Sequence, residues 1–156
     1  DGQGGNDYMD GGDGNDDMDG GDGSDTVHGG KGNDQLNPGS GQDLMTGGLG
    51  ADRFVFTKEA VLDATTTSTA DRIADFNHAE GDKIDLSQID SNPLVGGDQA
   101  FTFIGTAAFS GNGSELQVSH TNTATYLVGD YNGDGIGDFY IRLAPGLTLA
   151  AGDFML

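Results

Sequence analysis

A nine-residue unit recurs six times in unbroken register across residues 2–55. The units are GQGGNDYMD, GGDGNDDMD, GGDGSDTVH, GGKGNDQLN, PGSGQDLMT and GGLGADRFV. Position 8 is always apolar and position 6 is always aspartate, namely Asp7, Asp16, Asp25, Asp34, Asp43 and Asp52. Composition alone would also allow a disordered linker rich in glycine and aspartate, but the strict apolar register favours stacked structural repeats.

Glycines occupy most of positions 1, 2 and 4 of the units. Glycine adopts backbone angles that other residues avoid, so GGxGxD predicts a tight turn and the remaining three residues predict a short strand. Two units then form one coil, and successive coils stack at about the 4.8 Å strand spacing as a parallel β-roll. Odd units form one sheet and even units the other, so Met9, Val27 and Met45 face Met18, Leu36 and Phe54.

The same stacking predicts two columns of aspartates, one from the odd units and one from the even units. Neighbouring carboxylates about 5 Å apart repel by roughly 3 kcal/mol at an effective dielectric constant of 20. The thin apolar core is too small to offset the ordering of the repeat backbone as well. We therefore expect the roll to require cations, and a site of carboxylate and carbonyl oxygens suits Ca²⁺ better than zinc or magnesium.

The unit resembles the GGxGxDxUx repeat of the calcium-binding RTX proteins, where U is apolar. This resemblance implies several ions, each between turns eighteen residues apart, bound by two position-6 aspartates and by carbonyls of positions 1 to 4. It pairs Asp7 with Asp25, Asp16 with Asp34, Asp25 with Asp43, and Asp34 with Asp52. The turn glycines that it implicates at positions 2 and 4 are Gly12, Gly14, Gly21, Gly23, Gly30, Gly32, Gly39, Gly41, Gly48 and Gly50. Gln3 and Pro38 replace turn glycines, but each keeps its carbonyl.

The formal net charge of −20, with only six basic residues, argues against a nucleic-acid or anionic-membrane surface. Cysteine is absent, which excludes disulfides and thiolate metal sites. No run of residues is long and apolar enough for a membrane span, and the N-terminus lacks the pattern of a secretory signal peptide. Asp1 falls at position 9 of a unit, so we expect the chain to be a fragment of a longer protein.

After Phe54 the period stops, and short alternating runs predict antiparallel strands. These runs are FVF (54–56), RIADF (72–76), KIDL (83–86), AFTFI (100–104), ELQVSH (115–120), ATYLVG (124–129), DFYIRL (138–143) and FML (154–156). One helical turn is predicted at 58–62. We divide the chain into a roll over 1–55 and a C-terminal β cap over 56–156.

The succession ADRFVF, DRIADF, GDKIDLSQID, DFYIRL and the terminal DFML is similar to the C-terminal domain of serralysin-type (peptidase M10) secreted metalloproteases. The resemblance implies a β-sandwich that continues the roll and a further calcium held by Asp63 and Asp71. It also implies that Asp153 to Leu156 belong to an uncleaved type I secretion signal. An ordinary edge strand is the competing interpretation of this terminus.

Residues 130–138 have oxygen side chains at the spacing of an EF-hand-like loop, Asp130, Asn132, Asp134 and Asp138, with Gly135 at position 6. Position 12 is Ile141 instead of glutamate, and the flanking residues predict strands. A calcium loop and a simple Asn/Gly hairpin turn both remain open.

There is no HExxH motif, nucleophile elbow or P-loop, so we expect no enzyme within these residues. The resemblance to serralysins also allows a parent protein that is a secreted enzyme, such as a zinc protease. The predicted fold is all-β: a calcium-bound parallel β-roll followed by an antiparallel, sandwich-like cap. The predicted function is a calcium-induced folding module at the C-terminus of a bacterial protein exported to the extracellular space by a type I secretion apparatus, where it assists an upstream domain. The alternatives are a polysaccharide-binding R-type module, with Arg53, Lys58, Arg72 and Lys83 as a basic cluster, and a surface-layer or adhesin segment.

Overall fold

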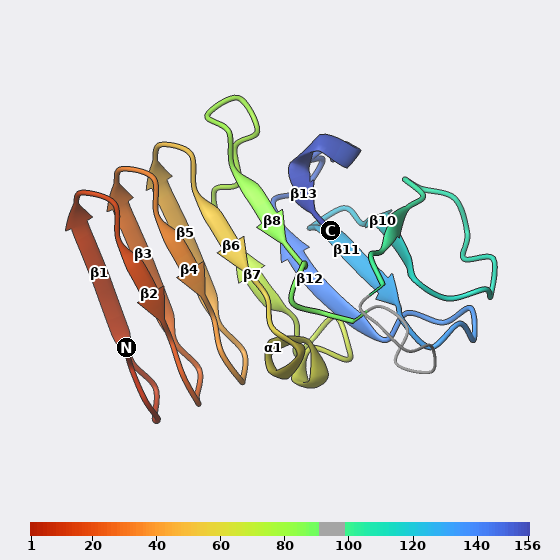
Figure 1. Cartoon of the computed structure of the whole chain (residues 1–156), viewed down its shortest axis with the longest axis horizontal. Coiled ribbons are helices and arrows are strands. Elements are labelled where there is room, and N and C mark those ends of the chain that lie inside the picture. The colour runs from red at the N-terminus through yellow and green to blue at the C-terminus, as the bar shows by residue number, and fades with distance from the viewer. Residues whose placement is uncertain (91–98) are drawn as a thin grey trace.

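The repeats form two facing sheets in a computed structural model that describes residues 1–90 and 99–156. Odd units supply β1 (Tyr8–Asp13), β3 (Thr26–Lys31) and β5 (Leu44–Leu49), and even units supply the shorter β2 (Asp17–Asp19), β4 (Gln35–Asn37) and β6 (Arg53–Val55). Within each sheet the strands are parallel and pair eighteen residues apart, for example Met9 with Val27 and Met18 with Leu36. Figure 1 shows these strands side by side, starting from the N-terminus. The predicted β-roll is confirmed.

The glycine turns account for this regularity. Every turn glycine predicted at positions 2 and 4 has a positive φ, between 85° for Gly39 and 141° for Gly23. Gln3 occupies position 2 of the first unit and adopts φ 67°, which is unfavourable for a residue with a side chain. Pro38 stands at position 1, where no positive φ is required, and this explains why the fifth turn keeps its shape.

Two further strands extend the roll beyond the repeats. β7 (Asp71–Ile73) pairs in parallel with β5, and β8 (Lys83–Asp85) pairs in parallel with β6. The short helix α1 (Lys58–Asp63) lies between β6 and β7 in the sequence, and Thr57 caps its first turn through Ala60 N. The two sheets therefore run across residue 55, and the division of the chain into 1–55 and 56–156 stays a prediction.

The C-terminal strands complete both sheets. The large sheet has the order β1-β3-β5-β7-β12-β11-β10-β9, and the small sheet has the order β13-β8-β6-β4-β2. The added strands are β9 (Thr102–Phe103), β10 (Glu115–His120), β11 (Thr125–Asp130), β12 (Phe139–Leu143) and β13 (Phe154–Met155), with a 3₁₀ turn at Ala151–Asp153 before β13.

The direction of these strands differs in part from the sequence-based expectation. Only β10, β11 and β12 form the predicted antiparallel meander. β7, β8, β9 and β13 pair in parallel instead. The reason is that β7 and β8 stack on the roll and so inherit its direction, while their later partners come from distant parts of the chain. Hydrophobic alternation predicts a strand but carries no information on its partner.

One apolar core runs through the molecule and widens towards the C-terminal half. In the roll it is one side chain deep, with Val27 and Met45 facing Leu36 and Phe54, all fully buried. Beyond β7 the same cluster gains larger groups, including the ring pairs Phe101–Phe139 and Phe103–Phe154 with centroids 5.8 and 4.8 Å apart. The cap therefore has a conventional core, whereas the repeats do not. No helix among the described residues is long and apolar enough to cross a membrane.

Candidate metal centres

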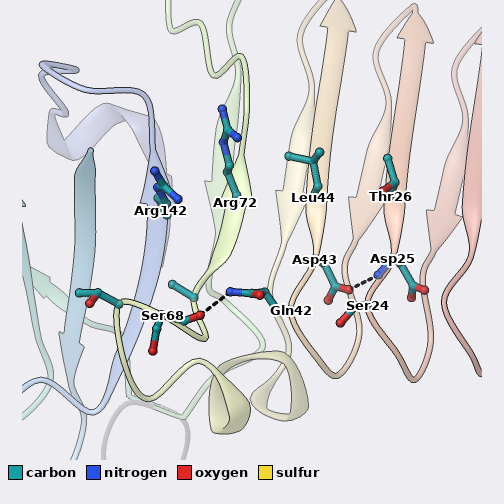
Figure 2. A pocket seen from close by; sticks show the side chains of 11 residues that line it. Ser24, Asp25, Thr26, Gln42, Asp43, Leu44, Ser68, Arg72 and Arg142 are labelled. Atoms are coloured by element: carbon teal, nitrogen blue, oxygen red, sulfur yellow. Dashed lines mark hydrogen bonds between the residues drawn. The ribbon is translucent and has the colours of Figure 1, made fainter. Parts of the chain in front are cut away.

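The position-6 aspartates form two columns along the roll, as predicted from the sequence. In the first, the amide nitrogen of Asp7 donates to Oδ1 of Asp25 at 2.8 Å. The amide nitrogen of Asp25 donates in turn to Oδ1 of Asp43 at 2.7 Å, as Figure 2 shows. In the second, the amides of Asp16 and Asp34 donate to Oδ1 of Asp34 and Asp52, both at 2.9 Å. Each carboxylate is thus fixed by the coil that precedes it in the sequence.

The other oxygen of each column aspartate is buried and has no hydrogen-bond partner among the described residues. This holds for Oδ2 of seven aspartates: Asp7, Asp16, Asp25, Asp34, Asp43, Asp52 and Asp71. From Asp25 onwards these residues are at most 2% exposed. A buried polar atom without a partner is rare and unfavourable in folded proteins. A regular series of them indicates that a ligand completes their surroundings.

The position-1 glycines leave space beside these oxygens. A Cβ atom built on Gly29 would lie 2.4 Å from Oδ2 of Asp34 and 2.6 Å from the carbonyl oxygen of Gly47, one coil further on. On Gly11 it would lie 2.6 Å both from Oδ2 of Asp16 and from the carbonyl oxygen of Gly29. Carboxylate and carbonyl oxygens from two coils therefore converge on a space free of side-chain atoms. These residues fit a hard cation such as Ca²⁺, which takes oxygen ligands at about 2.3–2.6 Å.

The electrostatics of the columns support the same conclusion. Burial raises the pKa of Asp43 to about 6, although the hydrogen bond from the Asp25 amide lowers it, and the neighbouring charge of Asp25 raises it further. Burial likewise raises the pKa of Asp52 to about 6, opposed by the Asp34 amide and assisted by the charges of Asp82, Asp34 and Asp75. Without cations the columns cannot stay fully ionised at no cost to the fold.

Both columns continue past the repeats. The amide of Asp43 donates to Oδ1 of Asp71 at 3.0 Å, across 28 residues, and the amide of Asp52 donates to Oδ1 of Asp82 at 3.0 Å, across 30 residues. Burial, and after it the charges of Asp43 and Asp63, raise the pKa of Asp71 to about 8 against the hydrogen bond from the Asp43 amide. Asp63 itself is exposed, and a calcium ion held by Asp63 and Asp71 stays a prediction.

The sequence-based reasoning missed Asp82 and Asp75. Oδ2 of Asp82 accepts the Asn77 amide, so the second column ends on a satisfied carboxylate. Asp75 accepts the amides of Gly47 and Gly48 at 3.0 and 2.9 Å. A signal for Asp82 exists, because Asp52, Asp71 and Asp82 each precede a basic residue and then a core residue, in DRF, DRI and DKI. A search by the nonapeptide period does not find this pattern, because the spacing between column aspartates changes after residue 52.

The loop between β11 and β12 has a different character. Oδ1 and Oδ2 of Asp130 accept the amides of Gly133 and Gly135 at 2.7 and 2.9 Å. Oδ2 of Asp138 accepts the amides of Tyr131 and Asn132, and its Oδ1 accepts the Asn132 side chain. Burial raises the pKa of Asp138, while the two amide bonds lower it and the charges of Asp130 and Asp134 raise it. These contacts are those of a self-contained hairpin turn, and a metal bound by Asp130, Asn132, Asp134 and Asp138 stays a prediction.

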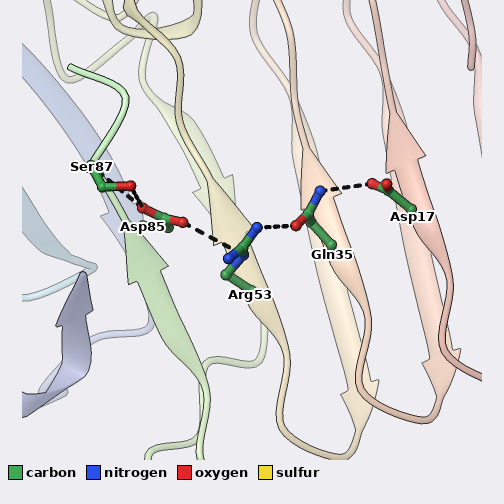
Figure 3. Close-up of polar contacts among 5 residues, drawn as sticks. All are labelled: Asp17, Gln35, Arg53, Asp85 and Ser87. Carbon is green, nitrogen blue, oxygen red and sulfur yellow. Dashed lines mark hydrogen bonds and ion pairs between the residues drawn. The ribbon is translucent and has the colours of Figure 1, made fainter. Parts of the chain in front are cut away.

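The four basic residues proposed as a cluster lie on different faces. Arg53 and Lys83 are register neighbours in the small sheet. Arg53 belongs there to a polar ladder in which it contacts Gln35 and pairs with Asp85 at 3.5 Å (Figure 3). Lys58 lies on α1, and Arg72 lies in the large sheet, where its neighbour is Arg142. The predicted cluster does not form, and Arg142 was missed.

The comparisons with known proteins agree with this architecture. The family model of the peptidase M10 serralysin C terminal matches residues 11–156. The chain belongs to this family. The serralysin C-terminal chain is also similar to the solution structure of the AlgE6R3 subunit of the mannuronan C5-epimerase of Azotobacter vinelandii, with 30% identity over 97% of this chain and 78% of that one and a TM-score of 0.68.

The AlgE6R2 subunit of the same epimerase gives 27% identity over 98% of this chain and 91% of that one, with a TM-score of 0.58. No curated protein sequence matches the chain. The chain is an RTX-type parallel β-roll module of the serralysin C-terminal family, and its repeat is the one associated with calcium binding.

Proposed function

We propose that this chain is a non-catalytic module whose folding depends on calcium bound along its two aspartate columns. The observation that carries the proposal is the series of seven buried Oδ2 atoms that have no partner within residues 1–90 and 99–156. When bound, calcium would neutralise the stacked carboxylates and replace the missing partners of these oxygens. The pairs Asp7–Asp25, Asp16–Asp34, Asp25–Asp43 and Asp34–Asp52 would hold it, with turn carbonyls as further ligands. Asp43–Asp71 extends the first column by one more pair of the same kind.

The apolar core of the repeats is too small to stabilise them alone, and repulsion within the columns adds to this deficit. Each of β2 to β5 has a single buried apolar side chain, and the metal-free charge of the roll opposes stacking. Binding only to the folded state shifts the folding equilibrium by mass action, so calcium concentration would set the folded fraction. The chain would stay unfolded where free calcium is scarce and fold where calcium is abundant.

Circular dichroism tests this proposal. Protein stripped of tightly bound metal is compared in chelator and in millimolar calcium. We expect the strand signal of the repeats to appear only in calcium. Strand signal that is the same in both conditions would sink the proposal.

We further propose that the module serves export of a bacterial protein through a type I secretion apparatus to the extracellular space, where its folding assists an upstream domain. Membership of the serralysin C-terminal family supports this role. In the folded chain Asp153 lies in the turn before β13, and Phe154 is buried in the small sheet next to β8. Asp153 and Phe154 would then be fully accessible to the apparatus only before folding, whereas Met155 and Leu156 stay exposed in the folded chain.

Deletion of Asp153 to Leu156 from a secreted parent protein should reduce export in a strain with a type I apparatus. The intracellular amount of the parent protein serves as the control for expression. Undiminished export would rule out a signal at this terminus and leave β13 as an ordinary edge strand.

A second candidate is binding of an acidic polysaccharide. Its support is the similarity to two subunits of a mannuronan epimerase, together with the pairing of Arg72 and Arg142 on one face. The folded, calcium-loaded chain is passed over immobilised alginate at physiological salt. Retention would support this candidate, and passage without delay would dismiss it.

A further inference from the structure

A groove of about 440 Å³ lies on the outer face of the large sheet, between the repeats and the loop that precedes β7 (Figure 2). Its walls include Arg72 and Arg142 on neighbouring strands, together with the polar side chains of Ser24, Thr26, Gln42 and Ser68. The Gln42 side chain donates to the Ser68 carbonyl oxygen at 2.5 Å and so links the fifth turn to this loop. The groove is therefore a built surface with contributions from several separate segments.

The two arginines stand directly opposite each other. β7 and β12 are parallel, and their register pairs Arg72 with Arg142. Leu44 lies opposite Arg72 on the other side, so the row continues into the repeats. Like charges at directly opposed positions of neighbouring strands are unfavourable. Yet neither guanidinium forms an ion pair or a hydrogen bond with any residue in the part of the chain that the structure describes.

This arrangement is unexpected in a chain with formal charge −20 and six basic residues. Within the described residues, Lys31 pairs with Asp13 at 2.7 Å and Arg53 pairs with Asp85. Acidic partners are thus abundant, but Arg72 and Arg142 remain without one. Two guanidiniums held together without a protein partner form a site for an oxyanion, and their planar forks fit the two oxygens of a carboxylate.

The remaining lining defines the rest of the ligand. Hydroxyl and amide groups of Ser24, Thr26, Gln42 and Ser68 donate and accept hydrogen bonds, as the hydroxyls of a sugar ring require. Asp25 and Asp43, the proposed calcium ligands, also line the groove, and without bound calcium they would repel a ligand with dense negative charge. One carboxylate per ring, with hydroxyls around it, matches both features.

We propose that the Arg72–Arg142 groove binds the carboxylate of an acidic sugar chain, with the neighbouring hydroxyl and amide side chains bound to its ring hydroxyls. This inference rests on the second candidate function and assigns residues to it. It is tested apart from the calcium-dependent folding proposal, because the titration uses calcium-saturated protein and folding is followed separately.

The test is a titration of calcium-saturated protein with trigalacturonate or trimannuronate, with maltotriose as the neutral sugar and acetate as the free carboxylate. Binding is followed by calorimetry and by NMR shifts of the groove residues. Arg72→Gln and Arg142→Gln should each weaken binding of a triuronate by about tenfold or more, the loss expected for one charge-assisted contact. Lys58→Gln removes the same charge on α1 and should leave the affinity within about twofold.

Circular dichroism and thermal melting of the same samples report folding separately. Loss of either arginine should leave the melting temperature unchanged or raise it, because one of two opposed like charges is removed. Weaker triuronate binding with an intact fold would support the proposal. It is overturned if no triuronate binds, if acetate or maltotriose binds as tightly, or if both arginine variants bind like the wild type.

Discussion

At the residue scale, the two oxygens of each column aspartate have different roles. Oδ1 of Asp25, Asp34, Asp43 and Asp52 accepts a backbone amide from the preceding coil, and this contact fixes the side chain. Oδ2 faces the space beside a position-1 glycine and has no protein partner. Removal of the charge and filling of the space are therefore separate perturbations, and each has a distinct expected outcome.

Asp34→Asn removes one charge from the middle of the second column and keeps an oxygen that can accept the Asp16 amide. We expect the free energy of unfolding in chelator to rise, because one repulsive charge is lost. We expect the calcium concentration at half-folding to rise as well, because the loss of an anionic ligand weakens calcium binding. Asp19→Asn makes the same charge change at an exposed residue in the neighbouring coil and should shift neither value. Equal behaviour of the two variants in a calcium titration followed by circular dichroism would contradict a ligand role for Asp34.

Gly29→Ala fills the space beside Oδ2 of Asp34. The new Cβ would lie 2.4 Å from that oxygen and 2.6 Å from the Gly47 carbonyl oxygen, so the oxygens have to move apart. We expect the half-folding calcium concentration to rise by roughly tenfold, which corresponds to about 1.4 kcal/mol. Gly152→Ala is the matched control, since a Cβ there meets no atom within 4 Å. The prediction fails if the two alanine variants titrate alike.

At the element scale, β13 closes the edge of the small sheet beside β8. It is only two residues long, but Phe154 is 8% exposed and its ring lies 4.8 Å from that of Phe103, so this strand joins the two sheets in the cap. Met155 is 37% exposed. Residues 153–156, which include β13, are also the predicted export signal. Their contribution to stability therefore needs to be measured separately from their effect on export.

Phe154→Ala should lower the free energy of unfolding of the calcium-loaded chain by about 3 kcal/mol, the usual loss for a buried aromatic side chain. Met155→Ala, one residue further along the same strand, should cost much less because that side chain is partly in solvent. Denaturant unfolding in constant calcium measures both. A similar loss in the two variants would mean that β13 is not anchored through Phe154.

The sequence predicted the elements of the roll far better than those of the cap. A strict period fixes the spacing, the turn angles and the inward face at once, which is why the pairing of Met9 with Val27 followed from the sequence. After Phe54 the spacing along each column becomes 28 and 30 residues, so neither the parallel direction of β7 and β8 nor the place of Asp82 follows from a period. The meeting of Arg72 and Arg142 depends on two strands 70 residues apart in sequence, and alternation within each strand contains no trace of it.

At the scale of the whole molecule, the stability of the metal-free chain depends on pH through its buried carboxylates. Burial raises the pKa of Asp43 and Asp52 from 3.8 to about 6, and that of Asp71 to about 8. Between about pH 4 and 8 the folded chain therefore binds more protons than the unfolded chain. The free energy of unfolding of the metal-free chain falls as the pH rises through this window.

We expect circular dichroism in chelator to show more strand at pH 4.5 than at pH 8. Calcium reverses the order, since protons compete with the metal for the same carboxylates and weaken its binding at low pH. Thermal melting at both pH values, with and without calcium, checks both statements. A metal-free chain that melts higher at pH 8 than at pH 4.5 would show that the column carboxylates do not oppose folding.

The amide-to-carboxylate contacts of the columns also have a polarity. In each of them the acceptor comes later in the sequence than the donor, from Asp7 through Asp25 and Asp43 to Asp71. The final acceptors are Asp71, the first residue of β7, and Asp82, which directly precedes β8, and both strands place a residue in the large apolar core. The amides of each coil thus bind carboxylates of the coil or strand that follows it in the sequence. We expect assembly to run from the cap towards the N-terminus, with each coil placing its amides on the carboxylates of the coil that follows it.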